Sequence, residues 1–197
     1  MAFFTAQKIS FVAPGTFWNL DEIAGRLVEI SASKASAALT LAFTLVRQAQ
    51  ELGEPVGWVT TAENFFYPPD AARNGADLNA LVVVRLTKSE NIARAGEKLL
   101  RSGGFGLIVF DLGDADISMP LQTRLTGLAH HHHTALVCLT EKDSAAFSLG
   151  SLVSLRAHAE KRAEDHRFAC TLRVFKDKRR GPTWSYEDLY TGPAGLC

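Results

Sequence analysis

Short apolar runs that alternate with helix-like segments are the feature that most constrains the fold of this chain. The apolar runs are residues 27–30, 56–60, 81–86, 107–111 and 134–140. Helical periodicity or capping residues mark the intervening segments 35–50, 89–101 and 118–129. We expect Ser89 to cap the second of these helices and Asp70 to cap a short helix in the loop at residues 64–76. Strands that are apolar throughout and alternate with helices are typical of a parallel sheet covered on both faces.

The pattern changes after about residue 150. Residues 152–159, 167–176 and 183–190 have strand character, and residues 179–182 carry the turn signal Arg-Arg-Gly-Pro. Consecutive strands joined by tight turns predict antiparallel hairpins. We therefore expect an α/β fold with a mainly parallel central sheet flanked by helices and a C-terminal antiparallel extension at its edge.

The length and charge of the chain limit the number of domains and the kinds of ligand that we expect. A chain of 197 residues can form one domain with a substantial core, which we expect over residues 25–197, after an N-terminal arm at residues 1–24. The 21 basic and 21 acidic residues give zero net charge, which argues against strong non-specific binding to nucleic acid. Nothing predicts a signal peptide or a membrane-spanning run. Three widely spaced cysteines, Cys138, Cys170 and Cys197, favour a reducing cytoplasm.

The strand at 27–30, the small-residue turn after it and the following helix form the setting of an ATP-binding phosphate loop. That loop requires the pattern G-x-x-x-x-G-K-[ST]. In the best register, Ala32 and Ala37 replace the glycines, Ala38 replaces the lysine and Leu39 replaces the magnesium-binding hydroxyl. Alanine restricts the close approach of the backbone to phosphate, and the lysine charge is lost. We expect a loop that no longer handles nucleotide, and no cofactor.

Two alternatives remain for this loop. It is an ordinary strand-to-helix turn that never bound a ligand, or it retains weak nucleotide binding through donors at Ser33, Lys34 and Ser36. Asp111, at the end of an apolar strand, is either a magnesium-binding acid or a solvated strand-end carboxylate, and we favour the second. Glu63 follows another strand but has no evident catalytic partner.

A run of four histidines, residues 130–133, ends the helical segment that begins near residue 118. Neighbouring helical positions point about 100° apart, so four in a row cannot converge on one metal ion. We expect a helix C-terminus, where the helix dipole favours imidazolium. Metal binding together with His158 or His166 is the alternative.

One basic cluster stands out against the neutral charge of the chain. It comprises Lys176, Lys178, Arg179 and Arg180, with Trp184 following. Basic residues beside aromatic ones can bind single-stranded nucleic acid by charge and stacking. The alternative is a solvated hairpin tip, so we expect weak binding of single-stranded DNA at most.

Aromatic residues also gather outside the expected strands and helices. Phe65, Phe66 and Tyr67 occupy a loop, and Phe3 and Phe4 belong to the N-terminal arm. These side chains either pack on the core or form a surface for self-association or for a partner. Both possibilities remain open from the sequence.

The order of these segments resembles the RecA-type core. Residues 25–30 look like the strand before the phosphate loop, and residues 107–111 look like the Walker B strand. Residues 127–141 look like the helix and strand that lead to the sensor position, and residues 174–179 look like the late basic strand. The sensor glutamine is replaced by Glu141, and the segments after residues 111 and 141 are too short for the two DNA-binding loops of RecA. This shortened version resembles the ImuA-type group, which is RecA-like and SulA-like.

The resemblance implies a non-catalytic accessory protein of SOS-induced mutagenic translesion DNA synthesis. It implies contacts with ImuB, a relative of the Y-family polymerases, with an error-prone C-family polymerase and with RecA itself, and it leaves self-association open. The alternatives are a cell-division inhibitor of the SulA type and a weak ATPase with an unusual loop.

Overall fold

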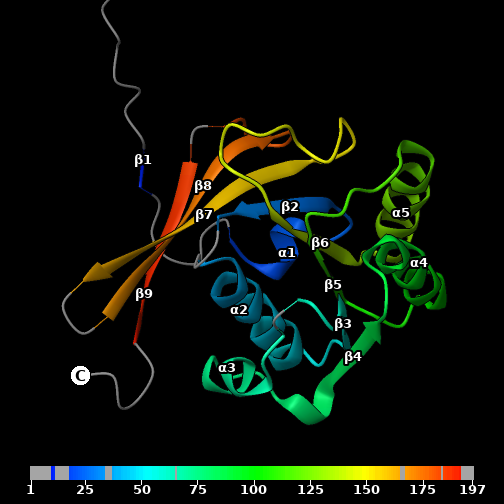
Figure 1. Cartoon of the computed structure of the whole chain (residues 1–197), viewed down its shortest axis with the longest axis horizontal. Coiled ribbons are helices and arrows are strands. Elements are labelled where there is room, and N and C mark those ends of the chain that lie inside the picture. Colours follow the sequence, from blue (N-terminus) through cyan, green and yellow to red (C-terminus); the bar gives the residue numbers. More distant parts are fainter. Residues whose placement is uncertain are drawn as a thin grey trace, which may run out of the picture.

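The computed structural model describes residues 10–11, 18–33, 37–64, 66–164, 167–182 and 184–191. The described residues form one nine-stranded sheet in the order β1-β9-β8-β7-β2-β6-β5-β3-β4 (Figure 1). Most of its strands are parallel, and the last three in the chain form the antiparallel part. The predicted fold class is therefore confirmed.

The parallel part is built from the apolar runs found in the sequence. Its strands are β2 (Leu27–Ala32), β3 (Val56–Thr61), β4 (Leu81–Leu86), β5 (Leu107–Gly113) and β6 (Ala135–Glu141). Every residue of β2 and of β3 is buried, which explains why neither run alternates between apolar and polar residues. The edge strand β4 is the exception, because three of its residues are only partly buried and two are exposed.

The antiparallel part extends the sheet beyond β2. Its strands are β7 (Leu155–Glu164), β8 (Arg167–Asp177) and β9 (Trp184–Thr191), with the two-residue strand β1 (Ser10–Phe11) beside β9. Strand β7 pairs with β2 in parallel and with β8 in antiparallel orientation. β7 is thus the strand at which the direction of the sheet changes.

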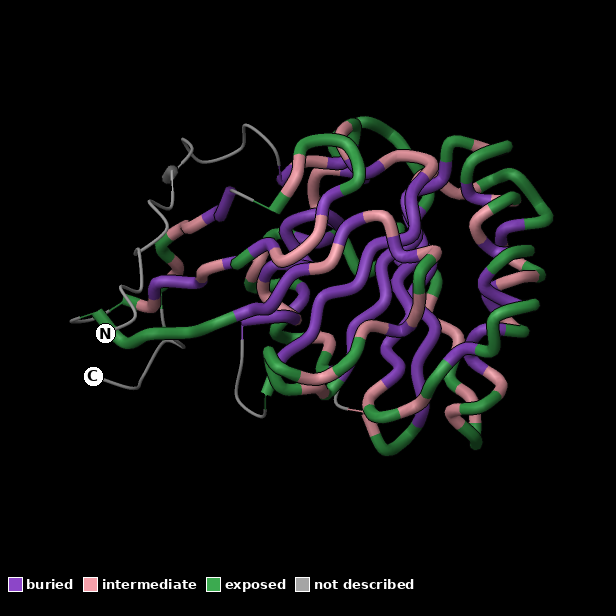
Figure 2. The backbone as a smooth tube through the Cα atoms, turned by 90° about the horizontal axis from the view of Figure 1, so that it is seen from above, coloured by how far each residue is buried: buried purple, intermediate pink, exposed green. Residues whose placement is uncertain are grey.

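Helices cover the two faces of the sheet separately. One face carries α1 (Leu20–Ile23), α2 (Ala38–Glu51) and α3 (Pro68–Arg73), and the other carries α4 (Ile92–Ser102) and α5 (Met119–His132). Each face encloses its own cluster of buried apolar side chains. Figure 2 shows the buried residues concentrated in the central strands, with exposed residues on the outer sides of helices and in loops.

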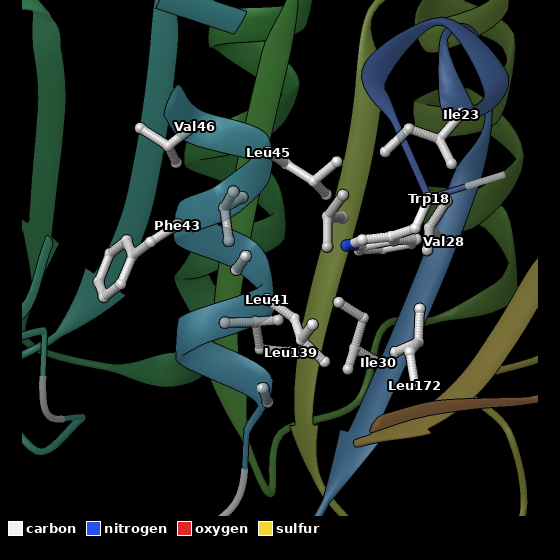
Figure 3. Close-up of a cluster of buried hydrophobic side chains, with 14 of the residues drawn as sticks. Trp18, Ile23, Val28, Ile30, Leu41, Phe43, Leu45, Val46, Leu139 and Leu172 are labelled. Atoms are coloured by element: carbon white, nitrogen blue, oxygen red, sulfur yellow. The ribbon is translucent and has the colours of Figure 1, made fainter. Parts of the chain in front are cut away.

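The core under α2 includes the end of the expected N-terminal arm. Trp18 and Ile23 are fully buried in it, together with Val28 of β2 (Figure 3). The indole of Trp18 therefore ties this part of the chain to the sheet. Phe3 and Phe4 lie outside the described residues. Within the described part of the chain, no helix has both the length and the apolar character needed to cross a lipid bilayer.

Two helix starts differ from expectation. Helix α3 begins at Pro68 and not at Asp70, because prolines fit the first helical positions, where an amide hydrogen has no partner to donate to. Ser89 does not cap α4. It begins a 3-10 turn, Ser89–Asn91, that leads into the helix. In the sequence of α3, the two prolines mark the start of the helix, and the capping preference of Asp70 favoured a later start.

Candidate functional site

Buried polar side chains gather where the parallel strands end. The buried residues in question are Ser31, Thr60, Thr61, Asp111, Thr140 and His158. They come from β2, β3, β5, β6 and β7, so neighbouring strands bring them to one edge of the sheet. Ligands of open α/β sheets bind outside the carboxyl ends of the strands. This edge is therefore the candidate functional site.

The segment that we compared with a phosphate loop adjoins this edge. Helix α2 begins at Ala38, with Ala37 as the residue before it, directly beyond the end of β2. Ala37 is fully buried, Ala32 is 5% exposed and Ala38 is 7% exposed, while Leu39 packs partly buried against the same core. Lys34, between the two elements, lies outside the described residues.

These alanines determine what the helix start can offer a ligand. The expected strand and helix are in place as β2 and α2, while residues 34–36 between them lie outside the described residues. In a working loop, a lysine and a hydroxyl at the helix start would face the phosphates and the magnesium ion. Here the methyl group of Ala38 lies in the core instead, and the isobutyl group of Leu39 packs partly buried against that core. Ala37 has no side-chain oxygen to cap the helix either.

Asp111 is buried at the same edge, on the face covered by α2. The Thr60 hydroxyl donates to its carboxylate at 2.9 Å, and the Asn64 amide donates to its backbone carbonyl at 2.6 Å. Burial raises the pKa of Asp111, the bond from Thr60 opposes that rise, and the nearby carboxylate of Glu141 adds to it. The expectation of a solvated strand-end carboxylate was wrong. β5 continues to Gly113 past a bulge, so Asp111 stays inside the sheet.

Glu29 is a second buried carboxylate, in the middle of β2 on the opposite face, and its exposed fraction is zero. The Ser148 hydroxyl donates to it at 2.6 Å and the Leu149 amide at 3.0 Å. Lys142 Nζ and Arg156 Nε lie 4.0 and 3.9 Å from its oxygens. Glu29 thereby fastens the segment that follows β6 onto the sheet.

A third buried acid, Asp177, lies where β8 ends. Arg26 donates to its carboxylate at 2.6 Å and the Trp184 indole at 3.1 Å, both inside the protein. Burial alone would raise the pKa of Asp177, but the Arg179 amide, the Arg26 guanidinium and the Trp184 indole outweigh it and lower that pKa. The pair joins the start of β2 to the last hairpin.

The sequence interpretation missed Glu29 and the pair of Arg26 with Asp177. A signal for the first was present, because a glutamate within the run Leu-Val-Glu-Ile must be buried if that run is a central strand. A buried charge needs partners, so its presence predicts nearby donors. The identity of those donors could not be read from the sequence.

Three of the four residues of the basic cluster, Lys176, Arg179 and Arg180, have partners within the protein. Arg180 pairs with Glu22 at 2.5 Å, and Arg179 donates to the Glu22 carbonyl at 3.1 Å. The Lys176 ammonium donates to the Ser151 carbonyl at 3.2 Å, and burial lowers its pKa. Lys178 is exposed. The cluster thus fastens the hairpin to α1 and to the segment before β7, in addition to presenting charge to solvent.

Phe66 belongs to the core. It is 6% exposed and lies 5.2 Å from Trp58 and 6.0 Å from Phe43, measured between ring centroids. Of the two possibilities that the sequence left open, packing on the core is the one observed for Phe66, which lies against the stacked rings of Phe43 and Trp58. Tyr67 is 58% exposed and stays a candidate, while Phe65 lies outside the described residues.

The histidine run ends α5, as expected. The helix extends to His132, and His133 adopts a left-handed conformation with φ of 56° as the cap. His130 lies against Gly25 before β2, whereas His158 contacts Ser31 at 3.2 Å near the end of β2. Six residues of strand separate these contacts by about 20 Å, so His158 and the run cannot share one metal ion. His166 lies outside the described residues.

Comparison with known proteins gives partial matches. RecA of Roseiflexus sp. (strain RS-1) is 34% identical over 117 residues, which are 53% of this chain and 33% of that protein. RecA of Haemophilus ducreyi is 30% identical over 128 residues, 59% of this chain and 34% of that protein. RecA of Chlorobaculum tepidum is 36% identical over 87 residues, which are 44% of this chain and 25% of that protein. No protein-family model matches the chain.

This chain thus spans about a third of the length of the first two relatives and a quarter of the third. The similarity supports a RecA-like core, as the ordered segments of the sequence predicted. The narrower ImuA-type assignment stays a prediction.

Proposed function

We propose that this protein is a non-catalytic RecA-like accessory factor of the response to DNA damage, which acts through contacts with other proteins. Its role would be in SOS-induced mutagenic translesion synthesis. The partners would be an ImuB-like polymerase relative, an error-prone C-family polymerase and RecA itself. A RecA-shaped surface would dock where a RecA protomer docks, without ATP hydrolysis.

The start of α2 is the observation that carries this proposal. A protein that turns over ATP needs donors and a cation at this helix start. Ala37 and Ala38 are instead built into the hydrophobic core, together with Ala32. Introducing the missing lysine would require burying a charge or moving the helix, which is costly. The proposal therefore treats the loop as structural.

The surroundings of Asp111 also support a protein that does not turn over ATP. A magnesium-binding acid has to be ionised and open to the metal and its waters. Asp111 is buried, is engaged by Thr60, and has a raised pKa, so its carboxylate is poorly suited to that task. This disfavours the alternative of a weak ATPase.

The basic cluster supports weak binding of DNA at most. Lys176, Arg179 and Arg180 each have a partner within the protein, and the whole chain has zero net charge. Binding that depends on neutralised phosphates would fall steeply with salt. We expect any affinity for single-stranded DNA to be small at about 0.15 M salt and to respond most to Lys178→Ala.

Titration calorimetry with magnesium-ATP tests the loop directly. We expect no binding at nucleotide concentrations up to about 1 mM, a range in which an ordinary nucleotide site would saturate. A full-length RecA provides the positive control. Micromolar affinity would overturn the proposal and favour the weak ATPase.

Pairwise capture with purified proteins tests the partners. The chain is immobilised and challenged separately with an ImuB-like protein, a C-family error-prone polymerase, RecA and the tubulin-like division protein. Retention of any of the first three supports the proposal. Retention of the division protein alone would favour the SulA-type alternative.

A further inference from the structure

The antiparallel strands β7, β8 and β9 have one face that helices do not cover within the described part of the chain. Buried side chains of these strands, such as Leu172 and Val174, belong to the core under α2. The core under α4 and α5 takes in none of the described residues of the three strands, and Figure 1 places these helices at the other end of the sheet. The side chains that alternate with Leu172 and Val174 therefore form an open face, where Arg162 and Arg173 are exposed.

The register of the strands arranges the side chains of this face in three rows. Residues directly opposite each other in an antiparallel pair point to the same side of the sheet. The rows are His158, Arg173 and Ser185; Glu160, Thr171 and Glu187; and Arg162, Ala169 and Leu189. Successive rows are two residues apart along each strand, which is about 6.8 Å. Arg173, the two glutamates and Arg162 therefore make the charge alternate from row to row.

An open cleft of about 400 Å³ lies over these rows. Ser185, in the wall of the cleft, is only 3% exposed, and its hydroxyl has no hydrogen-bond partner among the described residues. A buried hydroxyl without a partner is unfavourable, so a ligand that accepts its hydrogen bond would remove a cost that the free protein carries. Arg173 is directly opposite Ser185 in the strand pairing, so its positive charge lies beside this hydroxyl.

The charged groups of the cleft are held in place by their neighbours. The guanidinium of Arg173 lies 5.8 Å from the ring centroid of Phe175, and Thr171 donates a hydrogen bond to the carboxylate of Glu187 at 2.7 Å. Lys161 also borders the cleft, but its ammonium lies 4.1 Å from the ring centroid of Phe168. Side chains that are already positioned lose little further freedom when a ligand binds.

An extended peptide has the spacing that these rows require, because every second side chain points to the same side and lies about 6.8 Å from the next. We propose that the cleft binds an extended segment of a partner protein in which a basic residue is flanked, two positions away on each side, by an acidic residue. One acidic side chain faces Arg173 and the Ser185 hydroxyl, and the other faces Arg162. The basic side chain lies between Glu160 and Glu187.

The alternating charge selects a peptide over a nucleic acid. A phosphate backbone carries charge of one sign only, so the row with Glu160 and Glu187 repels it. Ion pairs at an exposed surface contribute little each and are screened by salt, so the isolated segment binds weakly. The inference rests on the proposed function, because it names the chemistry of a segment through which a protein partner would dock.

A nuclear magnetic resonance titration of the whole chain tests the site with a capped peptide, Thr-Glu-Thr-Lys-Thr-Glu-Thr. We expect a Kd of about 0.5 mM at about 20 mM salt, with the shifted amide signals concentrated in β7, β8 and β9. Two control peptides are Thr-Lys-Thr-Glu-Thr-Lys-Thr, which has the opposite charges, and Thr-Lys-Glu-Glu-Thr-Thr-Thr, which has the same composition without the spacing. Both should bind at least about fivefold more weakly.

Two variants separate binding from folding. Arg173→Ala should weaken binding of the first peptide at least about fivefold. Ser185→Ala should weaken binding about threefold and at the same time raise the Tm slightly, because it removes a buried hydroxyl that has no described partner. Arg101→Ala, on α4 at a side chain 62% exposed, is the matched control and should bind as the wild type does. Circular dichroism verifies that each variant keeps the fold.

Several results would overturn the inference. They are no binding at peptide concentrations up to about 5 mM, equal binding of either control peptide, and binding unchanged in Arg173→Ala. Sedimentation without peptide examines a second copy as the occupant, and self-association that Arg173→Ala abolishes would also overturn it. If a full-length partner is captured while the peptide fails, only this inference falls. If the peptide binds while none of the proposed partners is captured, the site stands and the proposed function falls.

Discussion

Glu29 and Asp111 are both buried carboxylates in central parallel strands, yet their surroundings differ. Glu29, on the α4 and α5 face, receives hydrogen bonds from Ser148 and the Leu149 amide and has two cations about 4 Å away. Asp111, on the α2 face, receives a bond from Thr60 and lies near the carboxylate of Glu141.

The difference shows that a buried charge can either stabilise the fold or lower its stability, depending on its partners. A buried ion is tolerated when its partners replace the lost water, and it is costly when they do not. Glu29 has such partners, and through them it holds the segment between β6 and β7 on the sheet. Asp111 has fewer partners that stabilise its charge, and burial therefore raises its pKa. Three substitutions test this contrast, in order of decreasing expected effect.

Glu29→Gln should be the most damaging. The substitution keeps the size of the side chain but removes the charge that faces Lys142 and Arg156, both of which are mostly buried. Breaking a buried ion pair by removing one partner costs about 3–5 kcal/mol. Urea unfolding measures the loss, with Glu90→Gln, whose side chain is exposed in the 3-10 turn before α4, as the control. A loss below about 1 kcal/mol would show that Glu29 is not a structural anchor.

Asp177→Asn should have a smaller effect that depends on pH. The folded pKa of Asp177 lies below its usual 3.8, so its stabilisation is fully present above pH 3.8 and is lost as pH falls through the lower folded value. At pH 7 we expect the variant to lose about 2 kcal/mol, because Arg26 loses its charged partner while the Trp184 bond survives. The difference from the wild type should shrink in acid, as thermal unfolding at several pH values will show. A constant difference would contradict the assignment.

Asp111→Asn should change stability least and in the opposite direction. Because its folded pKa is raised, the stability that Asp111 contributes is greatest below pH 3.8 and declines as pH rises through that elevated value. Asparagine keeps an acceptor for Thr60 and cannot ionise, so the variant should gain on the order of 0.5 kcal/mol at pH 7. Destabilisation at pH 7 that disappears in acid would show instead that the carboxylate is needed in its charged form.

Much of the architecture was predictable because its signals are local. The apolar runs predicted the parallel strands within a few residues, and the hairpin signals predicted the antiparallel extension. The sequence alone also shows Ala32, Ala37 and Ala38 at the positions where a phosphate loop would carry glycine and lysine. The start of α3 was misplaced because Asp70 and the prolines before it are competing local signals.

The sequence by itself thus determined the class of fold, the alternation of elements and the apolar side chains of Ala37 and Ala38 at the start of α2. Only the tertiary structure decided which buried charges find partners. Arg26 and Asp177 are 151 positions apart in sequence, and Glu29 and the Leu149 amide are 120 apart. Pairing at such separations depends on how the strands are ordered in the sheet, which no local pattern encodes.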